Sequence, residues 1–498
     1  MRLTVSGNIN EYYVQTLCLL FFPNERFSKT RDDAPDAPVA DVVLTESDGF
    51  AHARVSLSHG GKSAEATCDE PLDNVGLMSD ARRIAVGKAF FEAGKALTGK
   101  KPVWGILTGV RPSKLALKQL FEGKTKTEVK TALSRELFVS AKKAALVTDV
   151  ASVEKKIILK TPPRSCSVYI AIPFCPTRCS YCSFVSVSSK KLLSLLDDYL
   201  ARLKSDISRC FDLIKRLGLT VSTVYIGGGT PTTLDERQLK ILLDAVTSNT
   251  DVSTLEEFTV EAGRPDTVNE EKMRLLLENG VSRVSINTQT LNDEVLMNIG
   301  RHHTAKQYFE AFEIAKKAGF KHINTDLIAG LPGESYESFS DTVDRVIALG
   351  PDNITVHTLC IKSAADFAQN AKNMKTGSDT AKCVDYARAA LKKAGYAPYY
   401  MYRQKNTVDN LENVGYARPG AEGLYNIYMM EEIHSVFAVG ASAVTRLVSD
   451  DGEHIERIFE YKYPYEYLSE DVSVTTAEKE LKITEFYKNH RMIAQENT

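Results

Sequence analysis

The chain has 498 residues, of which 43% are hydrophobic and 25% are charged, and its formal net charge at pH 7 is −2. This length predicts two or three domains with full hydrophobic cores, and the charge balance argues against binding to nucleic acid or to an anionic membrane. The nine cysteines are an odd number, and six of them are scattered without paired spacing, which argues against a secreted disulfide scaffold. We expect a cytoplasmic protein without a membrane span, because the apolar segment 12–22 is typical of a core element.

The first 165 residues predict a small α+β domain of unknown role. Its expected strands are 41–45, 51–58 and 62–68, which alternate apolar and polar residues, and its expected helices are 80–97, 111–121 and 142–160. Thr161-Pro162-Pro163-Arg164 then interrupts the helical pattern, which places a domain boundary near residue 165.

Three cysteines lie in one short stretch, Cys175-Pro-Thr-Arg-Cys179-Ser-Tyr-Cys182, directly after the apolar run 168–174. Thiolate sulfur is a soft ligand that suits iron–sulfur clusters and zinc. A closed structural zinc site needs four protein ligands, and no fourth Cys or His lies in the loop or shortly after it. The spacing therefore favours a cubane cluster with one open metal position. A zinc site completed from a distant residue and a chance grouping of cysteines are the alternatives.

Short β-rich runs alternate with amphipathic helical segments after residue 165. The expected strands are 168–174, 223–226, 257–261, 283–287, 322–328 and 353–358. This alternation predicts a parallel sheet with right-handed crossovers, and ligands of such sheets bind at the carboxyl ends of the strands. Periodicity does not show whether the sheet closes into a barrel.

Glycines and polar residues stand at these expected strand ends. They are Gly227-Gly228-Gly229-Thr230, Glu261, Asn287, Gln289 and Asp326. A glycine backbone lets a ligand approach closely, and carboxylates or amides anchor an ammonium or a ribose diol. Each residue alone is as easily a surface or capping residue, so only their joint placement argues for a site. Arg301 suits a carboxylate, whereas His302 and His303 are treated as loop residues.

A family resemblance covers residues 168–447. It is carried by Tyr169-x3-Pro173-Phe174-Cys175-x3-Cys179-x-Tyr181-Cys182-x-Phe184, Gly227-Gly228-Gly229-Thr230-Pro231-Thr232, Glu261, Ser285-x-Asn287-x-Gln289, Gly300-Arg301-x-His303-Thr304 and Asp326-Leu327-Ile328-x-Gly330-Leu331-Pro332-Gly333. These motifs resemble the oxygen-independent coproporphyrinogen III oxidase (HemN-like) family of radical S-adenosylmethionine (SAM) enzymes. Segments 104–112 and 399–417 resemble its HemZ branch, the coproporphyrinogen dehydrogenases.

The resemblance implies an α/β fold, with a partial (β/α)6 radical SAM barrel at 166–360, an N-terminal α+β domain at 1–165 and a C-terminal α/β extension at 361–498 that supplies substrate-side elements. It implies a [4Fe–4S] cluster on Cys175, Cys179 and Cys182, and one or two SAM molecules. The positions that match the cluster-bound SAM are Tyr169, Gly228 and Glu261. Those that match a second SAM are Tyr181, Gly229, Thr230, Gln289, Arg301, Asp326 and Cys360.

The resemblance also implies a reaction. The reduced cluster cleaves SAM to methionine and a 5′-deoxyadenosyl radical, which takes hydrogen from a propionate of coproporphyrinogen III. Loss of CO2 and one electron leaves a vinyl group, and two such steps give protoporphyrinogen IX. Cationic side chains are expected around the four propionates. Arg403 and Lys405, interleaved with Tyr402, are the candidates, and an ordinary solvated strand is the alternative.

Two departures from the family pattern bear on the substrate. Ala171 stands where many relatives have His, and Phe184 stands where the best-studied branch has a further Cys. The Cys-x-Phe ending is shared with relatives that bind or insert haem. A HemW-like haem chaperone and another radical SAM reaction on a tetrapyrrole, such as anaerobic haem degradation, are therefore alternatives. The implied partners are a tetrapyrrole and a one-electron donor such as ferredoxin or flavodoxin, and a monomer is the default.

Overall fold

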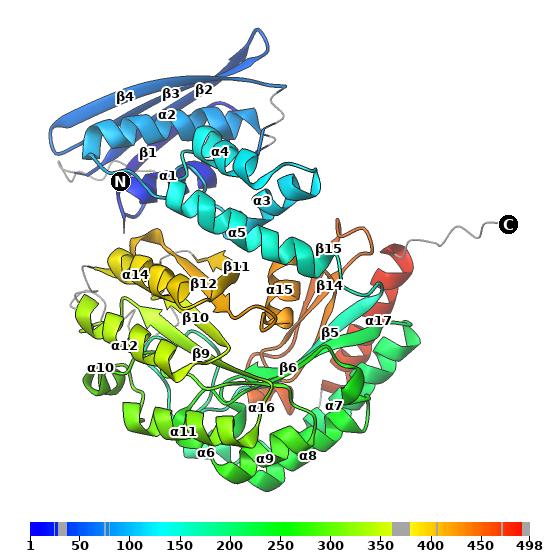
Figure 1. Cartoon of the computed structure of the whole chain (residues 1–498). Helices are drawn as coiled ribbons and strands as arrows, with labels where there is room; N and C mark the ends of the chain where they lie inside the picture. Colours follow the sequence, from blue (N-terminus) through cyan, green and yellow to red (C-terminus); the bar gives the residue numbers. More distant parts are fainter. Residues whose placement is uncertain are drawn as a thin grey trace. The chain divides into compact units, whose positions relative to one another are not determined.

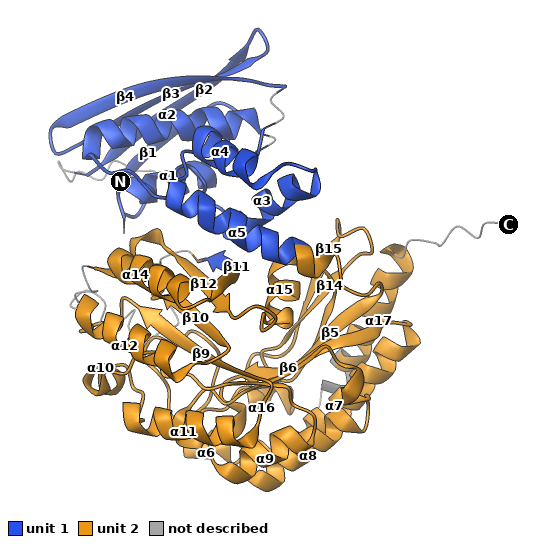
Figure 2. Ribbon diagram, viewed as in Figure 1, with its two compact units in different colours: residues 1–155, 401–403 blue, residues 156–400, 404–498 orange. Residues whose placement is uncertain are grey.

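A computed structural model (Figure 1) describes the chain apart from residues 24, 28–36, 74–75, 79, 361–378, 405–406, 470–471 and 491–498. The chain forms two compact units. Unit 1 comprises residues 1–155 and 401–403, and unit 2 comprises residues 156–400 and 404–498 (Figure 2). The three predicted domain ranges stay a prediction.

Unit 1 contains a sheet with strand order β1-β2-β3-β4 and a set of helices. The strands are β1 (Arg2–Ser6), β2 (Val39–Ser47), β3 (Phe50–His59) and β4 (Lys62–Pro71), and the helices are α1 (Glu11–Phe21), α2 (Ala81–Thr98), α3 (Pro112–Phe121), α4 (Lys126–Leu137) and α5 (Ala141–Ile158). The sheet is antiparallel from β2 to β4, while β1 adds to β2 in parallel. Strand β1 alternates polar and apolar residues, but it is only 5 residues long and none of them is fully buried, and the sequence analysis did not predict it.

Capping residues determine where helix α2 of unit 1 begins and ends. Its N-cap Asp80 accepts hydrogen bonds from the backbone of Arg82 and Arg83, and Gly99 ends it in the left-handed conformation. Small residues between the caps let neighbours come close: a Cβ at Gly94 would lie 2.6 Å from the Phe21 ring of α1. The helix packs along β3 and β4 (Figure 1).

Unit 2 is built on a larger sheet whose central strands are parallel and follow chain order. They are β5 (Ser165–Ile172), β6 (Thr220–Gly228), β7 (Glu257–Glu261), β8 (Arg283–Ser285), β9 (His322–Ala329) and β10 (Asn353–Thr358). The helices that connect them are α6 (Lys190–Leu193), α7 (Leu196–Arg216), α8 (Glu236–Thr247), α9 (Glu270–Glu278), α10 (Asp293–Asn298), α11 (Ala305–Ala318) and α12 (Tyr336–Leu349). This confirms the predicted α/β class and the partial (β/α)6 arrangement.

Later segments extend this sheet at both ends. Strands β11 (Ala397–Arg403) and β12 (Glu412–Ala417) follow β10 in the strand order, and β13 (Val436–Val439), β14 (Val444–Val448) and β15 (Ile455–Phe459) follow β5. The remaining helices are α14 (Thr380–Lys393), α15 (Leu424–Glu431), α16 (Pro464–Tyr467) and α17 (Val472–His490). Within the described residues, β11 and β15 are the two edges of the sheet, which therefore does not close on itself.

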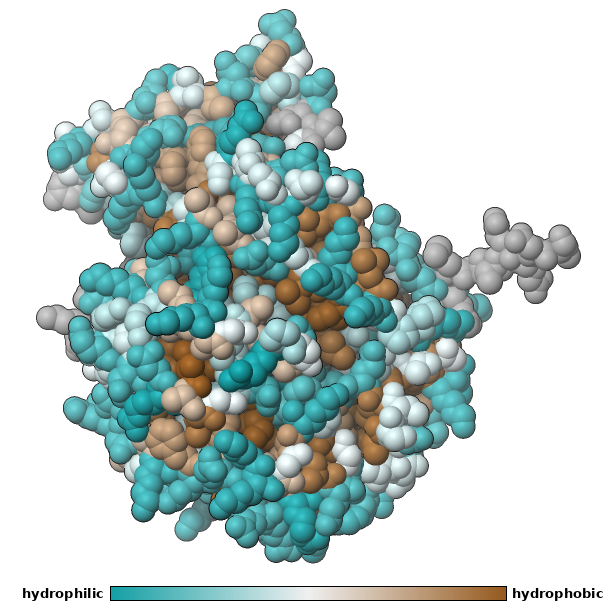
Figure 3. All heavy atoms as spheres, in the orientation of Figure 1, coloured by the Kyte–Doolittle hydropathy of each residue, from teal (hydrophilic) through white to brown (hydrophobic). Residues whose placement is uncertain are grey.

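The helices of unit 2 are amphipathic, and they cover the outer side of the parallel strands (Figure 1). Mainly hydrophilic side chains cover the visible face of these helices (Figure 3). Among the described residues, none of the helices combines the length and apolar character needed to cross a membrane.

Candidate functional site

Polar side chains from several strands of unit 2 share one face of the sheet. Tyr169, Tyr225, Asp326 and His357 each keep part of their surface exposed in the midst of buried strand residues. The Tyr169 and Tyr225 ring centroids are 6.0 Å apart, and His357 Nε2 lies 3.8 Å from Asp326 Oδ2. Because side chains of a strand alternate between faces, these contacts place the residues on one face of the sheet.

Glu261, at the carboxyl end of β7, is the central acid of this face. Its Oε1 accepts a hydrogen bond of 2.6 Å from the Tyr225 hydroxyl. Burial, with the charge of Asp326 adding to it, raises the pKa of Glu261 to about 7, against the opposing effect of hydrogen bonds from Tyr225 and the Gly228 backbone. Near neutral pH the carboxyl is thus poised between its two forms, and a cationic or hydrogen-bond-donating ligand would favour the carboxylate.

Three tyrosine rings stack beside Glu261. The three ring centroids form a triangle: Tyr225 of β6 lies 6.0 Å from Tyr169 of β5 and 4.5 Å from Tyr425 of α15, and Tyr169 lies 6.2 Å from Tyr425, with interplanar angles of 22°, 26° and 19°. Gly228 follows on β6 with φ of +110°, and a Cβ there would lie 3.5 Å from the Tyr169 hydroxyl. The stack therefore forms an aromatic wall next to a stretch of side-chain-free backbone.

The cysteine loop begins directly after β5. The Cys175 backbone N–H donates to Val187 O, the Ser180 N–H donates to Ile299 O, and the Cys182 N–H donates to Cys179 O, each at 3.0 Å. All three thiols are partly buried and unpaired by disulfides. Burial raises the pKa of Cys175, and that of Cys182 to about 11, so these sulfurs carry protons until a metal displaces them.

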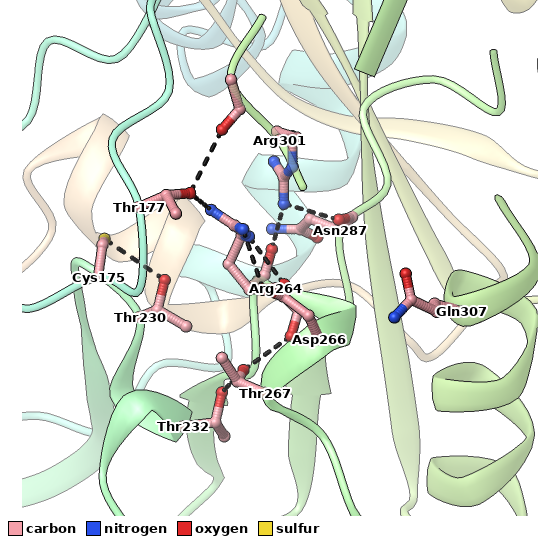
Figure 4. A network of polar contacts seen from close by, with 12 residues as sticks. Cys175, Thr177, Thr230, Thr232, Arg264, Asp266, Thr267, Asn287, Arg301 and Gln307 are labelled. Carbon is pink, nitrogen blue, oxygen red and sulfur yellow. Dashed lines mark hydrogen bonds and ion pairs between the residues drawn. The ribbon is translucent and has the colours of Figure 1, made fainter. Parts of the chain in front are cut away.

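The loop is tied to the glycine-containing turn after β6. The Cys175 sulfur lies 3.5 Å from Thr230 Oγ1, and the Thr230 backbone N–H donates to Phe174 O (Figure 4). The Gly229 N–H donates to Ile172 O. A Cβ at Gly229 would lie only 2.5 Å from Phe174 O, so only glycine fits this close approach of two backbones.

Arg301 is buried under the same loop, with 3% of its surface exposed. Its Nη1 donates to the Tyr181 hydroxyl at 3.0 Å. Its Nη2 donates to the Asn287 carbonyl at 2.9 Å (Figure 4). Among the described residues, Arg301 forms no ion pair with a carboxylate, and its Nε has no hydrogen-bond partner. A buried guanidinium in this state favours an anionic neighbour.

Gln289 occupies a strained position four residues after the fourth parallel strand, β8. Its φ is +73°, which costs about 1 kcal/mol for a residue with a side chain. Backbone bonds of 3.0 Å to Asp326 O and from the Ile328 N–H hold it there. Its buried Oε1 has no partner among the described residues. A polar atom that is buried and unsatisfied at a strained residue suggests a ligand-binding position.

The other predicted site residues are spread more widely. Cys360 lies two residues after β10 and forms an isolated bridge with Thr407. Tyr402 and Arg403 belong to unit 1, and Lys405 lies outside the described residues. The Arg403 guanidinium lies 4.9 Å from the Trp104 ring, and its backbone N–H donates to Val110 O at 2.7 Å.

His302 and His303 occupy the loop before α11, as predicted. His302 is exposed, whereas His303 is buried and neither of its ring nitrogens has a hydrogen-bond partner among the described residues. Burial, with the charges of Arg301 and Arg264, lowers the pKa of His303 to about 2. His303 is therefore a neutral imidazole over the whole physiological range.

Comparison with known proteins assigns the family. The radical SAM superfamily matches residues 169–346. The "oxygen-independent coproporphyrinogen-III oxidase-like protein HemZ" of Bacillus subtilis is 36% identical over 378 residues, which is 75% of each chain. This chain belongs to the HemZ branch of the HemN-like radical SAM family. The "heme chaperone HemW" of the same bacterium is 30% identical over 63% of this chain and 80% of its own.

A solved structure shares the fold of this radical SAM chain. The coproporphyrinogen III oxidase HemN of Escherichia coli aligns with a TM-score of 0.50 and 23% sequence identity, over 65% of this chain and 72% of that one. Membership of the family means that this chain uses a [4Fe–4S] cluster and SAM.

The site residues fit these two cofactors. In the described part of the chain, no three His, Cys, Asp or Glu side chains converge on a point where they could hold one metal ion. A cubane does not need such convergence, because each thiolate binds a different iron atom. The glycine backbone, the partly exposed Glu261 and the unsatisfied Gln289 oxygen supply the contacts that a nucleoside and an amino acid moiety require.

Sequence reasoning missed some residues of this site. Tyr225 precedes the glycine turn by two positions and therefore shares a strand face with Gly227, a signal that was available. Tyr425 and Arg264 had no such signal, because Tyr425 is distant in sequence and Arg264 stands in a loop.

Proposed function

We propose that this chain catalyses the oxygen-independent oxidative decarboxylation of coproporphyrinogen III to protoporphyrinogen IX, as a radical SAM oxidoreductase of porphyrin and haem biosynthesis. The observation that carries the proposal is the three-thiol loop held against the glycine turn of β6, on the strand ends that present Glu261. The similarity to HemZ over three quarters of both chains supports the choice of substrate.

In this proposal, Cys175, Cys179 and Cys182 would hold the cluster, which would bind SAM through its amino acid group. The cluster supplies the electron that generates the hydrogen-abstracting radical from SAM. Tyr169 and the Gly228 backbone border the bound nucleoside, and the Glu261 carboxylate accepts hydrogen bonds from its ribose. Glu261 and Asp326 together give this face a negative potential that suits a sulfonium cation.

A second SAM molecule would be held by a further set of residues around the loop. The proposed set is Tyr181, Gly229, Thr230, Gln289, Arg301, Asp326 and Cys360. Its support is the unsatisfied Gln289 oxygen and the Arg301 guanidinium, which has no carboxylate partner among the described residues. Arg301 would bind the SAM carboxylate, and the Gln289 amide oxygen would accept hydrogen bonds from the SAM ammonium or ribose hydroxyls.

The tetrapyrrole would be bound by the C-terminal part of the chain, with Tyr402, Arg403 and Lys405 as proposed contacts to the ring and its propionates. Arg403 is 4% exposed, and it donates hydrogen bonds to the Leu107 and Gly109 carbonyls. Substrate binding through Arg403 therefore requires a propionate to replace these carbonyls. A ferredoxin or flavodoxin would deliver the electron.

A haem chaperone is the second candidate, because the similarity to HemW proteins reaches 32% identity over 56% of this chain. In that case the same cofactors would accompany a bound haem, and no tetrapyrrole would be converted.

An anaerobic incubation tests the proposal. Cluster-loaded protein is given SAM, a low-potential reductant and either coproporphyrinogen III or haem, and the products are identified by mass spectrometry. The proposal predicts CO2, 5′-deoxyadenosine and protoporphyrinogen IX from the first substrate, and none from a Cys179→Ser variant. Haem binding without turnover would support the chaperone, and haem consumption would support a degradation reaction.

A further inference from the structure

The segment between the first two thiols of the cysteine loop is fastened through a single hydroxyl. Thr177 Oγ1 accepts a hydrogen bond of 2.8 Å from Arg264 Nη1 and donates one of 3.3 Å to the Gly300 carbonyl (Figure 4). A hydroxyl has one proton to donate and lone pairs to accept, so both interactions are satisfied together. Thr177 thereby connects the loop after β5 with the loop after β7 and the loop before α11.

Arg264 is itself rigidly held. It is 3% exposed, and its Nε and Nη2 donate to the two carboxylate oxygens of Asp266, each at 3.0 Å. This bidentate pairing fixes the plane of the guanidinium. The remaining nitrogen, Nη1, is then directed at Thr177. A lysine has no planar fork and cannot satisfy Asp266 and Thr177 in the same geometry.

The Arg264 backbone is connected, through the turn after β6, to the start of the cysteine loop. Its carbonyl accepts a hydrogen bond of 2.7 Å from Thr267 Oγ1, which lies 2.6 Å from Thr232 Oγ1. Thr232 is joined through Pro231 to Thr230, and the Thr230 hydroxyl contacts the Cys175 sulfur at 3.5 Å. Two chains of polar contacts therefore run from Arg264 to the loop, one through its side chain and one through its backbone (Figure 4).

We propose that Arg264 is a positioning residue that holds the cysteine loop, through Thr177, in the conformation that accepts the iron–sulfur cluster. The proposal rests on the cluster-binding role of the three cysteines. Three thiolates on a short loop must meet three irons at fixed separations, and a loop that is ordered before loading loses less conformational entropy when the cluster binds. The contacts of Arg264 are within the protein, so they exist before any iron arrives.

A matched pair of Thr177 variants isolates the hydroxyl. Thr177→Val keeps the side-chain shape and removes the bond to Arg264, whereas Thr177→Ser keeps the hydroxyl. Both proteins and the wild type are loaded with iron and sulfide under anaerobic conditions, and iron release to a chelator is followed without SAM. We expect release from Thr177→Val to be about tenfold faster, because a hydrogen bond to a charged group is lost. Thr177→Ser should stay within about twofold of the wild type.

The same variants are compared without a cluster. We expect Thr177→Val to expose Cys175 and Cys179 to faster alkylation in the metal-free protein, measured well below the melting temperatures of both proteins so that global unfolding does not contribute. Arg264→Lys should release iron at least as fast as Thr177→Val, because it also disturbs the pairing with Asp266. The double variant should release iron no faster than Arg264→Lys alone, because the contact between Arg264 and Thr177 is then already lost. Arg274→Lys, which changes an exposed arginine paired with Glu278, is the control for a general effect of the substitution.

The outcomes separate this inference from the proposed function. If Thr177→Val retains iron and protects its thiols as well as the wild type does, the positioning role of Arg264 is wrong and the proposed function is untouched. If the wild type itself assembles no iron–sulfur cluster, the proposed function fails, and this inference falls with it.

Discussion

At the scale of single residues, the neighbours of the partly buried Glu261 carboxyl determine how easily it ionises. Glu261 has acidic and phenolic neighbours from four elements: Tyr169 on β5, Tyr225 on β6, Asp326 on β9 and Tyr425 on α15. Burial raises the pKa of each tyrosine well above neutrality, so all three rings stay uncharged. Asp326 opposes ionisation of Glu261, and the Tyr225 hydroxyl favours it.

We predict that Tyr225→Phe shifts the pH dependence of SAM binding upward. In the wild type, affinity should rise as the pH passes through about 7, where Glu261 ionises. Loss of the hydrogen bond to the carboxylate should move this midpoint upward by about one pH unit. The measurement is the dissociation constant of SAM for cluster-loaded protein between pH 6 and 9. Tyr425→Phe removes a hydroxyl from the same stack and should leave the midpoint in place. An unshifted midpoint in Tyr225→Phe would contradict the assignment.

At the scale of elements, the site lies where two parallel strands and their loops come into backbone contact. The end of β5 and the turn after β6 approach so closely that Gly229 has no room for a side chain. This contact determines the direction in which the cysteine loop leaves β5. The geometry of the loop is therefore a property of the β5–β6 pair as much as of its own sequence.

We predict that Gly229→Ala destabilises the protein by about 1–3 kcal/mol, because the new Cβ would lie 2.5 Å from Phe174 O and 2.7 Å from Phe174 N. Its melting temperature and its iron content after loading should both fall. Gly263→Ala is the matched control, since the nearest atom to its Cβ would be Asn287 Nδ2 at 3.6 Å, an ordinary contact. Equal iron contents in the two variants would disprove the steric argument.

At the scale of the whole molecule, segments from the end of the chain complete the sheet of unit 2. Strand β13 pairs in parallel with β5, and His434 lies just before β13. Its Nδ1 is 3.0 Å from Ser165 Oγ, and its Nε2 is 2.8 Å from Ser167 Oγ. Burial, with a contribution from Arg446, lowers the pKa of His434 to about 3.

We predict that acidification weakens this connection. The unfolded chain protonates a histidine near pH 6.5, whereas folded His434 stays neutral until about pH 3. Stability is therefore lost as the pH falls below 6.5, by about 2 kcal/mol at pH 5. In thermal melts at pH 7 and pH 5, His434→Gln should lose less stability than the wild type. His303 and His322 act in the same direction, so some loss remains. The exposed His302→Gln should behave as the wild type, and an identical loss in His434→Gln would refute the assignment.

Local patterns were sufficient to predict most of the fold. The strands 257–261 and 353–358 were predicted with the bounds that the structure shows, because their buried β-branched residues form short runs between clear helices. The polar residues at the strand ends also share a face of one sheet, since parallel strands place their carboxyl ends together. Strand β1 and the parallel pairing of β13 with β5 were not predicted, because no pattern in the sequence indicates which strand each of them pairs with.

By itself, the amino-acid sequence determined the family, the two cofactors and the six parallel strands, because cysteine spacing and hydrophobic periodicity are local properties of the chain. Only the tertiary structure decided which groups surround Glu261 and which side chain fastens Thr177. Tyr425 is separated from Glu261 by more than 160 residues, and Arg264 reaches Thr177 across two loops. Such contacts depend on the register of the sheet and on the packing of its loops, and no periodicity in the chain encodes them.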